Sequence, residues 1–315
     1  MSDRSKNPIL LTGAHRSGKT YFAKAICSTG TVARIPEPLN RRTRPGLGGL
    51  RPTYTFHLIN HRNGSLFESQ LQDSLRYKYH LAKELKACIG FKDYLRIVRD
   101  LPISVFHRLT SKRPLIDDPF AVISADWFHT QLGMDVVIMI RHPASFVASI
   151  ISQRYRFDFN NFLAQNDLME EHLQGFADEI REFSLCEKPL IEQGILLWRV
   201  LYSIVAKYQQ NYGSRWLFIR FEDLATHGEP AFLSAFETLG LTLTPAQKNT
   251  LARFINAPNH HEAKREGFTD LMGQFARPIE MQVKYFNLKL KEDEISHIRA
   301  GTGDVWPLFY SANDW

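Results

Sequence analysis

The sequence predicts an α/β fold in which helices cover both faces of a central parallel sheet. Short apolar segments with strand character occur at residues 8–12, 32–35, 113–117, 135–140 and 215–221. Helical patterns separate most of these segments, as the crossover connections between parallel strands require. The run at residues 135–140 is apolar at every position after its first residue, which is typical of a strand that is buried on both faces.

Two long segments between the strands predict helical insertions. Residues 65–110 contain few helix breakers and predict two long helices, over Ser65 to Leu109. Residues 158–211 predict a second helical region that is interrupted at Gly175, Pro189 and Gly194, with one long buried helix within residues 187–211. A chain of 315 residues is close to the upper size of one hydrophobic core, so a single domain over residues 1–315 is expected.

The first strand leads into a glycine-bounded loop that predicts an anion site. Residues 8–20 read Pro-Ile-Leu-Leu-Thr-Gly-Ala-His-Arg-Ser-Gly-Lys-Thr and are followed by a helical pattern. The spacing of Gly13, Gly18, Lys19 and Thr20 fits the nucleotide P-loop pattern. Backbone N–H groups of such a loop and of the following helix start bind phosphate or sulfate groups, and glycine allows the backbone to approach the anion closely.

A second anion site is expected at the end of the fourth strand. Arg141-His-Pro143 follows that strand, and Ser149 lies two turns into the next helical pattern. Arg141 therefore stands at the carboxyl end of a parallel strand, where doubly wound sheets bind their ligands. A basic side chain and a hydroxyl suit a phosphate that is separate from the first, so the ligand is expected to be a nucleotide charged at two places.

These two motifs resemble those of the sulfotransferases that use 3′-phosphoadenosine 5′-phosphosulfate (PAPS), especially the bacterial and carbohydrate-type branch. Weaker marks occur in the same order as in that family: Glu37-Pro38, Asp118-Pro119 before Trp127, Trp198-Arg199, residues 221–224, and residues 310–315. The resemblance extends over nearly the whole chain. It implies a P-loop-NTPase-like three-layer fold, in which the C-terminal segment over residues 256–315 covers the site.

The resemblance also implies roles for individual residues. The phosphosulfate is expected at the loop, with Arg16 at its bridging oxygen and sulfuryl group. Arg141 and Ser149 are expected to bind the 3′-phosphate. The expected donor-binding set is Gly13, His15, Arg16, Ser17, Gly18, Lys19, Thr20, Arg141 and Ser149.

Transfer to a hydroxyl requires a base that accepts the hydroxyl proton, and Glu37 is the first candidate. It follows the second strand and therefore lies on the same sheet edge as Arg16 and Arg141. The resemblance to carbohydrate-type members carries the base role over to Glu37. The alternative is an ordinary loop glutamate paired with Arg41 or Arg42. Histidines are the rival bases, and the candidates are His57, His61, His107, His142 and, within the loop, His15.

Two positions depart from the family pattern, and they keep other functions open. Lys19 stands where the family usually has Ser or Thr, and Asp117 stands where it often has Lys. A lysine in the first helical turn opposes the helix dipole unless an anion is bound, which favours a ligand role for Lys19. Lys19-Thr20 with Asp117-Asp118 would also suit a magnesium-dependent P-loop kinase or NTPase. A structural or acceptor-contacting role is expected for Asp118, and none is assigned to Asp117.

Other segments carry weaker expectations. Residues 41–52 contain four arginines with Pro and Gly, which predicts an exposed loop that acts as a lid, as an anionic-acceptor surface or only as a soluble connection. Glu222-Asp223 is expected to cap the helix after the fifth strand. Residues 256–280 predict an irregular basic stretch in which His260-His261 is solvated and Arg277 lies at the surface.

Composition limits the function further. The net charge of +6 suits an anionic cofactor without identifying nucleic acid as a partner. The three cysteines lie far apart and fit a reduced compartment. The sequence shows neither a signal peptide nor an apolar run long enough to cross a bilayer, so a cytoplasmic enzyme is expected. The expected reaction transfers a sulfuryl group from PAPS to a carbohydrate or glycolipid hydroxyl without a required metal; the alternatives are the magnesium-dependent enzyme and a non-catalytic nucleotide-binding protein.

Overall fold

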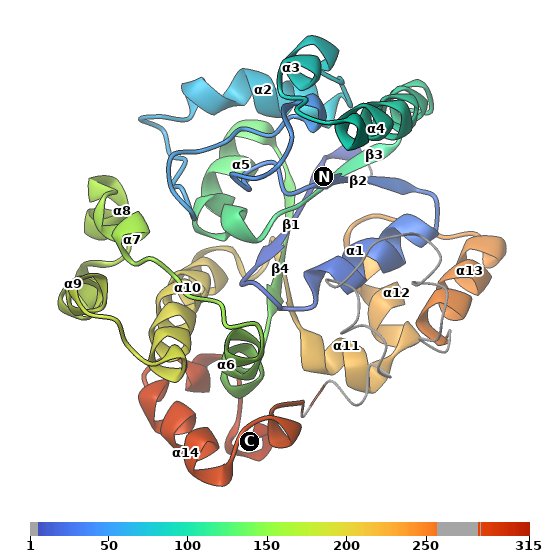
Figure 1. Cartoon of the computed structure of the whole chain (residues 1–315). Coiled ribbons are helices and arrows are strands. Elements are labelled where there is room, and N and C mark those ends of the chain that lie inside the picture. Colours follow the sequence, from blue (N-terminus) through green and yellow to red (C-terminus); the bar gives the residue numbers. More distant parts are fainter. Residues whose placement is uncertain (1–5, 257–282, 284) are drawn as a thin grey trace.

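The computed structural model describes residues 6–256, 283 and 285–315, and in these residues a five-stranded sheet forms the centre of the molecule (Figure 1). Its strands are β1 (Ile9–Gly13), β2 (Val32–Pro36), β3 (Arg113–Asp117), β4 (Asp135–Ile140) and β5 (Leu217–Arg220). They lie in the order β2-β3-β1-β4-β5, and every neighbouring pair is parallel. All five predicted strands are present, and the α/β prediction is confirmed.

Helices pack on both faces of this sheet, as Figure 1 shows. The helices are α1 (Lys19–Ser28), α2 (Ser65–Leu75), α3 (Leu81–Lys86), α4 (Phe91–Leu109), α5 (Ala125–Leu132), α6 (Pro143–Ser152), α7 (Asn160–Leu163), α8 (Asn166–Glu171), α9 (Ala177–Leu185), α10 (Leu190–Tyr212), α11 (Phe221–His227), α12 (Glu229–Thr238), α13 (Pro245–Asn256) and α14 (Glu292–Gly301). None of those in the described part of the chain combines the length and the apolar character that a membrane-spanning helix requires.

Successive side chains of a strand point to opposite faces of the sheet, so the strand residues divide between two apolar clusters, one on each face. In β1, Ile9 and Leu11 belong to the cluster with residues of α1 and α11–α13 on one face, whereas Leu10 belongs to the cluster with residues of α5, α6 and α10 on the other. All three side chains are fully buried. Because both faces are covered, the central strands β1 and β4 are almost continuous apolar runs, which is the pattern that predicted them.

The helical insertions differ from the prediction in two places. The first contains three helices, α2, α3 and α4, and not two. The chain leaves α2 through Tyr77, whose φ is 52°, and enters α4 through Gly90. In the second insertion, Gly194 does not interrupt the helix but lies inside α10. A Cβ at this position would lie 3.2 Å from the side chain of Val147, so glycine allows α10 to pack closely on α6.

The prediction of an exposed loop at residues 41–52 is wrong in part. Arg41, Arg42 and Arg51 are exposed, but Gly46 is buried and begins a tightly packed segment. The side chain of Arg44 turns inward and forms ion pairs with Glu84 of α3 and Asp93 of α4. The carboxylates fix this arginine and thereby join the loop to the first helical insertion.

Close contact with β4 requires glycine at position 13, the end of β1. Gly13 pairs with Met139 of β4 and has a φ of 134°. A Cβ at this position would lie 2.3 Å from the carbonyl oxygen of Met139, a distance that real Cβ atoms do not reach. The loop that follows Gly13 therefore leaves the sheet close to β4 and to the residues that follow it.

We expect Gly13→Ala to destabilise the protein more than Gly30→Ala. Gly30 also has a positive φ, of 74°, but nothing lies within 4 Å of a Cβ there. Gly30→Ala should lower the free energy of unfolding by about 1 kcal/mol through backbone strain alone. Gly13→Ala should lower it by about 2 kcal/mol more, because the sheet must also move. Urea unfolding curves measure both losses, and equal losses would contradict the steric role of Gly13.

Candidate functional site

The glycine-bounded loop connects β1 to α1 and is shaped by left-handed backbone. Arg16 has a φ of 63°, and Gly18, the residue before α1, has a φ of 86°. A Cβ on Gly18 would lie 2.0 Å from the ring of Phe221, so only glycine fits against this ring. The first N–H groups of α1 have no carbonyl partner within the helix. N–H groups of this kind, together with those of a glycine-bounded loop, are suited to an anion.

Ser17 adds a polar atom to this loop. Its side chain is fully buried, and its Oγ has no hydrogen-bond partner in the described part of the chain. A buried hydroxyl without a partner is costly. A phosphate or sulfate oxygen at the loop would supply such a partner, which fits the expected donor.

The two predicted anion motifs meet in space. Arg16 Nε in the loop donates a hydrogen bond of 3.0 Å to Ser149 Oγ in α6. The guanidinium of Arg141 stacks over the ring of Phe221 at 4.1 Å, and the same ring packs against Gly18. One aromatic ring therefore lies between the loop and Arg141.

Arg141 is held on several sides. Its backbone N–H donates to the Tyr202 hydroxyl at 2.8 Å, and its carbonyl accepts from Trp198 Nε1 at 3.0 Å. Its Nε lies 3.6 Å from Glu222 Oε1. Both aromatic residues belong to α10, so this long helix fixes the chain at the point where β4 ends.

Glu222 and Asp223 lie in the first turn of α11, as the sequence predicted, but the N-terminus of this helix has no side-chain cap hydrogen bond. Asp223 binds Arg220, the residue before the helix. The partners of Glu222 lie outside α11. Its carboxylate accepts hydrogen bonds from the backbone N–H of His142 and from the hydroxyl of Tyr310. The rings of Tyr310 and Trp315 pack on His142, with the Trp315 centroid 4.5 Å away. The described end of the chain therefore lies directly against the second motif.

A buried network of charges lies below the loop. Lys19 Nζ donates to Asp117 Oδ1 at 2.8 Å and lies 3.6 Å from Glu37 Oε1. Arg34 of β2 binds the other oxygen of Asp117 with its Nε at 2.7 Å and its Nη2 at 2.5 Å. Asp117 is fully buried and Lys19 is 4% exposed. Burial by itself would raise the pKa of Asp117, but Lys19 and Arg34 hold that pKa below its ordinary value.

The two departures from the family pattern therefore contact each other. The sequence combined Lys19 and Asp117 only as a possible magnesium site; it predicted no ion pair between them and no role for Arg34. The anion that balances Lys19 in the structure is Asp117, so the opposed helix dipole requires no bound ligand.

Glu37 lies at the edge of this network. Its backbone is left-handed, with a φ of 45°, and its side chain is 31% exposed. Its Oε2 accepts a hydrogen bond from Asn40 at 2.7 Å. The cation near its carboxylate is Lys19, and not Arg41 or Arg42, as the alternative interpretation proposed.

Asp118 fixes the turn that carries Glu37. Its two carboxylate oxygens accept hydrogen bonds from the backbone N–H groups of Leu39 and Phe120, at 2.6 and 2.8 Å. Burial raises the pKa of Asp118 to about 7, although these N–H groups and the Lys19 charge act in the opposite direction. These contacts fit the structural role expected for Asp118.

The histidine candidates lie in different environments. Burial, together with the charges of Lys19 and Arg16, lowers the pKa of His15 to about 3, so its imidazole is neutral at pH 7. Its ring packs against aromatic side chains, namely those of Phe56, Phe120 and Tyr155. Burial also lowers the pKa of His57 and of His107. His260, His261 and Arg277 lie outside the described residues.

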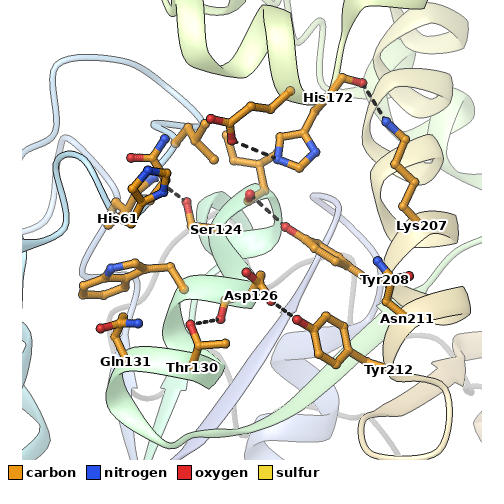
Figure 2. A pocket seen from close by; sticks show the side chains of 16 residues that line it. His61, Ser124, Asp126, Thr130, Gln131, His172, Lys207, Tyr208, Asn211 and Tyr212 are labelled. Atoms are coloured by element: carbon orange, nitrogen blue, oxygen red, sulfur yellow. Dashed lines mark hydrogen bonds and ion pairs between the residues drawn. The ribbon is translucent and has the colours of Figure 1, made fainter.

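His61 lines a different pocket, which Figure 2 shows from close by. This pocket of about 340 Å³ lies among α5, the end of α8 and the C-terminal end of α10. Several of its polar groups bind one another or the backbone: Tyr212 binds Asp126, and the Tyr208 hydroxyl donates to the carbonyl of Ile123 (Figure 2). The expected donor-binding residues do not line it.

Comparison with solved structures identifies the fold. The sulfotransferase domain from the curacin biosynthetic pathway matches with a TM-score of 0.52 and 12% sequence identity, over 94% of this chain and 97% of that domain. The chain has a sulfotransferase fold. The sulfotransferase domain from the Synechococcus PCC 7002 olefin synthase matches over 94% of this chain and 95% of that domain, with 14% identity and a TM-score of 0.45. No family model matches the chain, and the search of curated proteins finds no significant match.

We expect Asp117→Asn to destabilise the protein strongly, because it leaves Lys19 and Arg34 without their common counter-ion. The free energy of unfolding should fall by about 3 kcal/mol, the usual cost of breaking a buried ion pair.

The matched control is Asp178→Asn. Asp178 pairs with Arg181 at 2.7 Å, almost the same distance as Lys19 to Asp117, but its side chain is 99% exposed. Exposed pairs contribute little, so urea unfolding should show no measurable change. Similar losses in the two variants would contradict the importance of burial in the Asp117 network.

Proposed function

We propose that this protein is a sulfotransferase that transfers the sulfuryl group of PAPS to an acceptor hydroxyl. The observation that carries the proposal is the hydrogen bond of 3.0 Å between Arg16 and Ser149. It joins the loop suited to a 5′-phosphosulfate with the helix suited to a 3′-phosphate. The sulfotransferase fold over almost the whole chain supports the same assignment.

The donor would lie across the carboxyl edge of the sheet. The N–H groups at the start of α1 and the hydroxyl of Ser17 would hold the phosphosulfate, with Arg16 at the bridging oxygen. Arg141 and Ser149 would bind the 3′-phosphate. These groups are fixed before the donor arrives, and fixed dipoles and charges are efficient at stabilising a leaving oxygen.

Glu37 is the proposed base. It is the partly exposed carboxylate of the network and lies on the same sheet edge as the loop. Its turn is held by Asp118 and Asn40, so its carboxylate has a defined position, as proton removal from an aligned hydroxyl requires. We propose a carbohydrate or glycolipid as the acceptor and a single catalytic domain over residues 1–315.

The magnesium-dependent kinase or NTPase is less well supported. That function needs an aspartate that is available to a metal ion. In the structure, both oxygens of Asp117 bind cationic side chains, and both oxygens of Asp118 accept backbone hydrogen bonds. Lys19 is likewise turned toward Asp117. A metal ion would have to displace contacts that are already made.

Ser149→Ala should weaken binding of 3′-phosphoadenosine 5′-phosphate (PAP) selectively. The loss of one hydrogen bond to a charged phosphate should lower PAP affinity about tenfold. Affinity for adenosine 5′-phosphate, which has no 3′-phosphate, should stay unchanged in calorimetry. Ser152→Ala, which changes an exposed serine of the same helix, is the matched control. Equal affinities of the unaltered protein for the two nucleotides, or magnesium-dependent ATP turnover without use of PAPS, would contradict the proposal.

Glu37→Gln should abolish transfer while leaving the donor site intact. The neutral amide cannot accept the acceptor proton, so turnover should fall about a hundredfold or more. PAP affinity, measured by calorimetry, should stay near that of the unaltered protein. Turnover is measured with labelled PAPS and cell extract, followed by identification of the labelled product. Retained turnover would mean that another residue is the base. Tight PAP binding by the unaltered protein without any labelled product would favour a non-catalytic protein.

A further inference from the structure

The exposed apolar side chains of this protein are concentrated in one place. In the described part of the chain, all large apolar residues that are exposed belong to residues 66–109, apart from Leu185, Leu288 and Leu308. Most of them lie on α3 and α4. Figure 1 shows these two helices at the periphery of the molecule, beside the end of the sheet that β2 and β3 form.

On α4 the exposed apolar residues form one stripe along the whole helix. Its main members are separated by three, four or seven residues, except for the adjacent pair Val105 and Phe106: Phe91, Leu95, Val98, Val105, Phe106 and Leu109. This spacing places them on one helical face. Their exposed fractions range from 45% to 79%. Stripes of this kind normally face a core, whereas here Ile97 and Ser104, on another face of α4, are the buried residues.

The charges beside this stripe have one sign. The charged residues of α3 and α4 that are exposed are all basic: Lys83, Lys86, Lys92, Arg96, Arg99 and Arg108. The acidic residues of the two helices are turned inward. Glu84 is 1% exposed, and the side chains of Asp93 and Asp100 are 15% and 13% exposed.

Contacts with the body of the protein fix this orientation. Arg44 binds Glu84 of α3 and Asp93 of α4 from below, and Asp93 also accepts hydrogen bonds from the backbone N–H groups of Ile89 and Gly90. Glu84 and Asp93 therefore serve as anchors, whereas Asp100 pairs with Arg99 of the same helix and Asp93 also pairs with Arg96. The apolar stripe with its basic flank is left on the outside.

We propose that this face of α3 and α4 docks on the surface of an anionic lipid membrane. A helix with an apolar stripe, aromatic residues and basic flanks lies in the interface of a bilayer, with its apolar side chains among the acyl chains and its basic side chains at the headgroups. The uniform positive charge also disfavours a second copy as the occupant, because two such faces would bring their basic side chains together. This docking is independent of the proposed sulfuryl transfer.

Flotation of the full chain with lipid vesicles tests the proposal. The protein should float with vesicles of phosphatidylcholine and phosphatidylglycerol, bind vesicles of phosphatidylcholine alone weakly, and lose binding as salt is added. Lys92→Glu combined with Arg96→Glu should remove the preference for the anionic vesicles. Equal binding to both kinds of vesicle, or none to either, would overturn the proposal.

A matched pair of variants tests the position of the docking face. Leu109 and Leu185 are each the last residue of a helix and are 79% and 78% exposed. Leu109→Glu should lower vesicle binding about tenfold, because a leucine no longer enters the apolar layer, whereas Leu185→Glu should have no effect. Both should keep the unfolding curve of the unaltered protein. Equal effects on vesicle binding would overturn the proposal. So would a concentration-dependent dimer that Leu109→Glu abolishes and that does not bind vesicles, because this outcome would make a second copy the occupant.

Discussion

The site depends on one buried carboxylate, that of Asp117. It ends β3 between β1 and β2 and binds Lys19 of α1 with one oxygen and Arg34 of β2 with the other. Opposite charges in a poorly solvated place interact strongly, and none of the three groups is tolerated there alone. The start of α1, the end of β2 and the end of β3 are thereby held together, and this holds the loop in register with the turn that carries Glu37.

The second constraint is steric and comes from Phe221. Its ring packs on Gly18 on one side and under the guanidinium of Arg141 on the other. The position of the loop and that of the β4 end are therefore coupled through one side chain that carries no charge. The hydrogen bond from Arg16 to Ser149 adds a direct connection between the loop and α6. The charge network and the aromatic ring thus hold the loop, Arg141 and α6 together at the carboxyl edge of the sheet, where we propose that the donor binds.

The fold was predictable because both faces of the sheet are covered, which makes β1 and β4 almost continuous apolar runs, and because helical patterns separate most of the strands. The positions of the loop and of Arg141 at the carboxyl ends of β1 and β4 were predictable from the strand pattern, and that of Ser149 in the following helix was predictable from the helical pattern. The contact between Lys19 and Asp117 was not predicted, because it depends on the directions of the side chains that leave the start of α1 and the end of β3, and not on spacing along the chain. Gly194 was misinterpreted for a similar reason: its role is to admit Val147 of another helix, and no local pattern reports that.

Arg16 and Glu37 share an uncommon backbone. Both adopt a left-handed φ although neither is glycine, and each such residue carries a cost of about 1 kcal/mol that the surrounding contacts must offset. Glycine at either position would relieve this cost and would also remove the side chain. The chain therefore gives up some folding free energy to present these two side chains at the sheet edge.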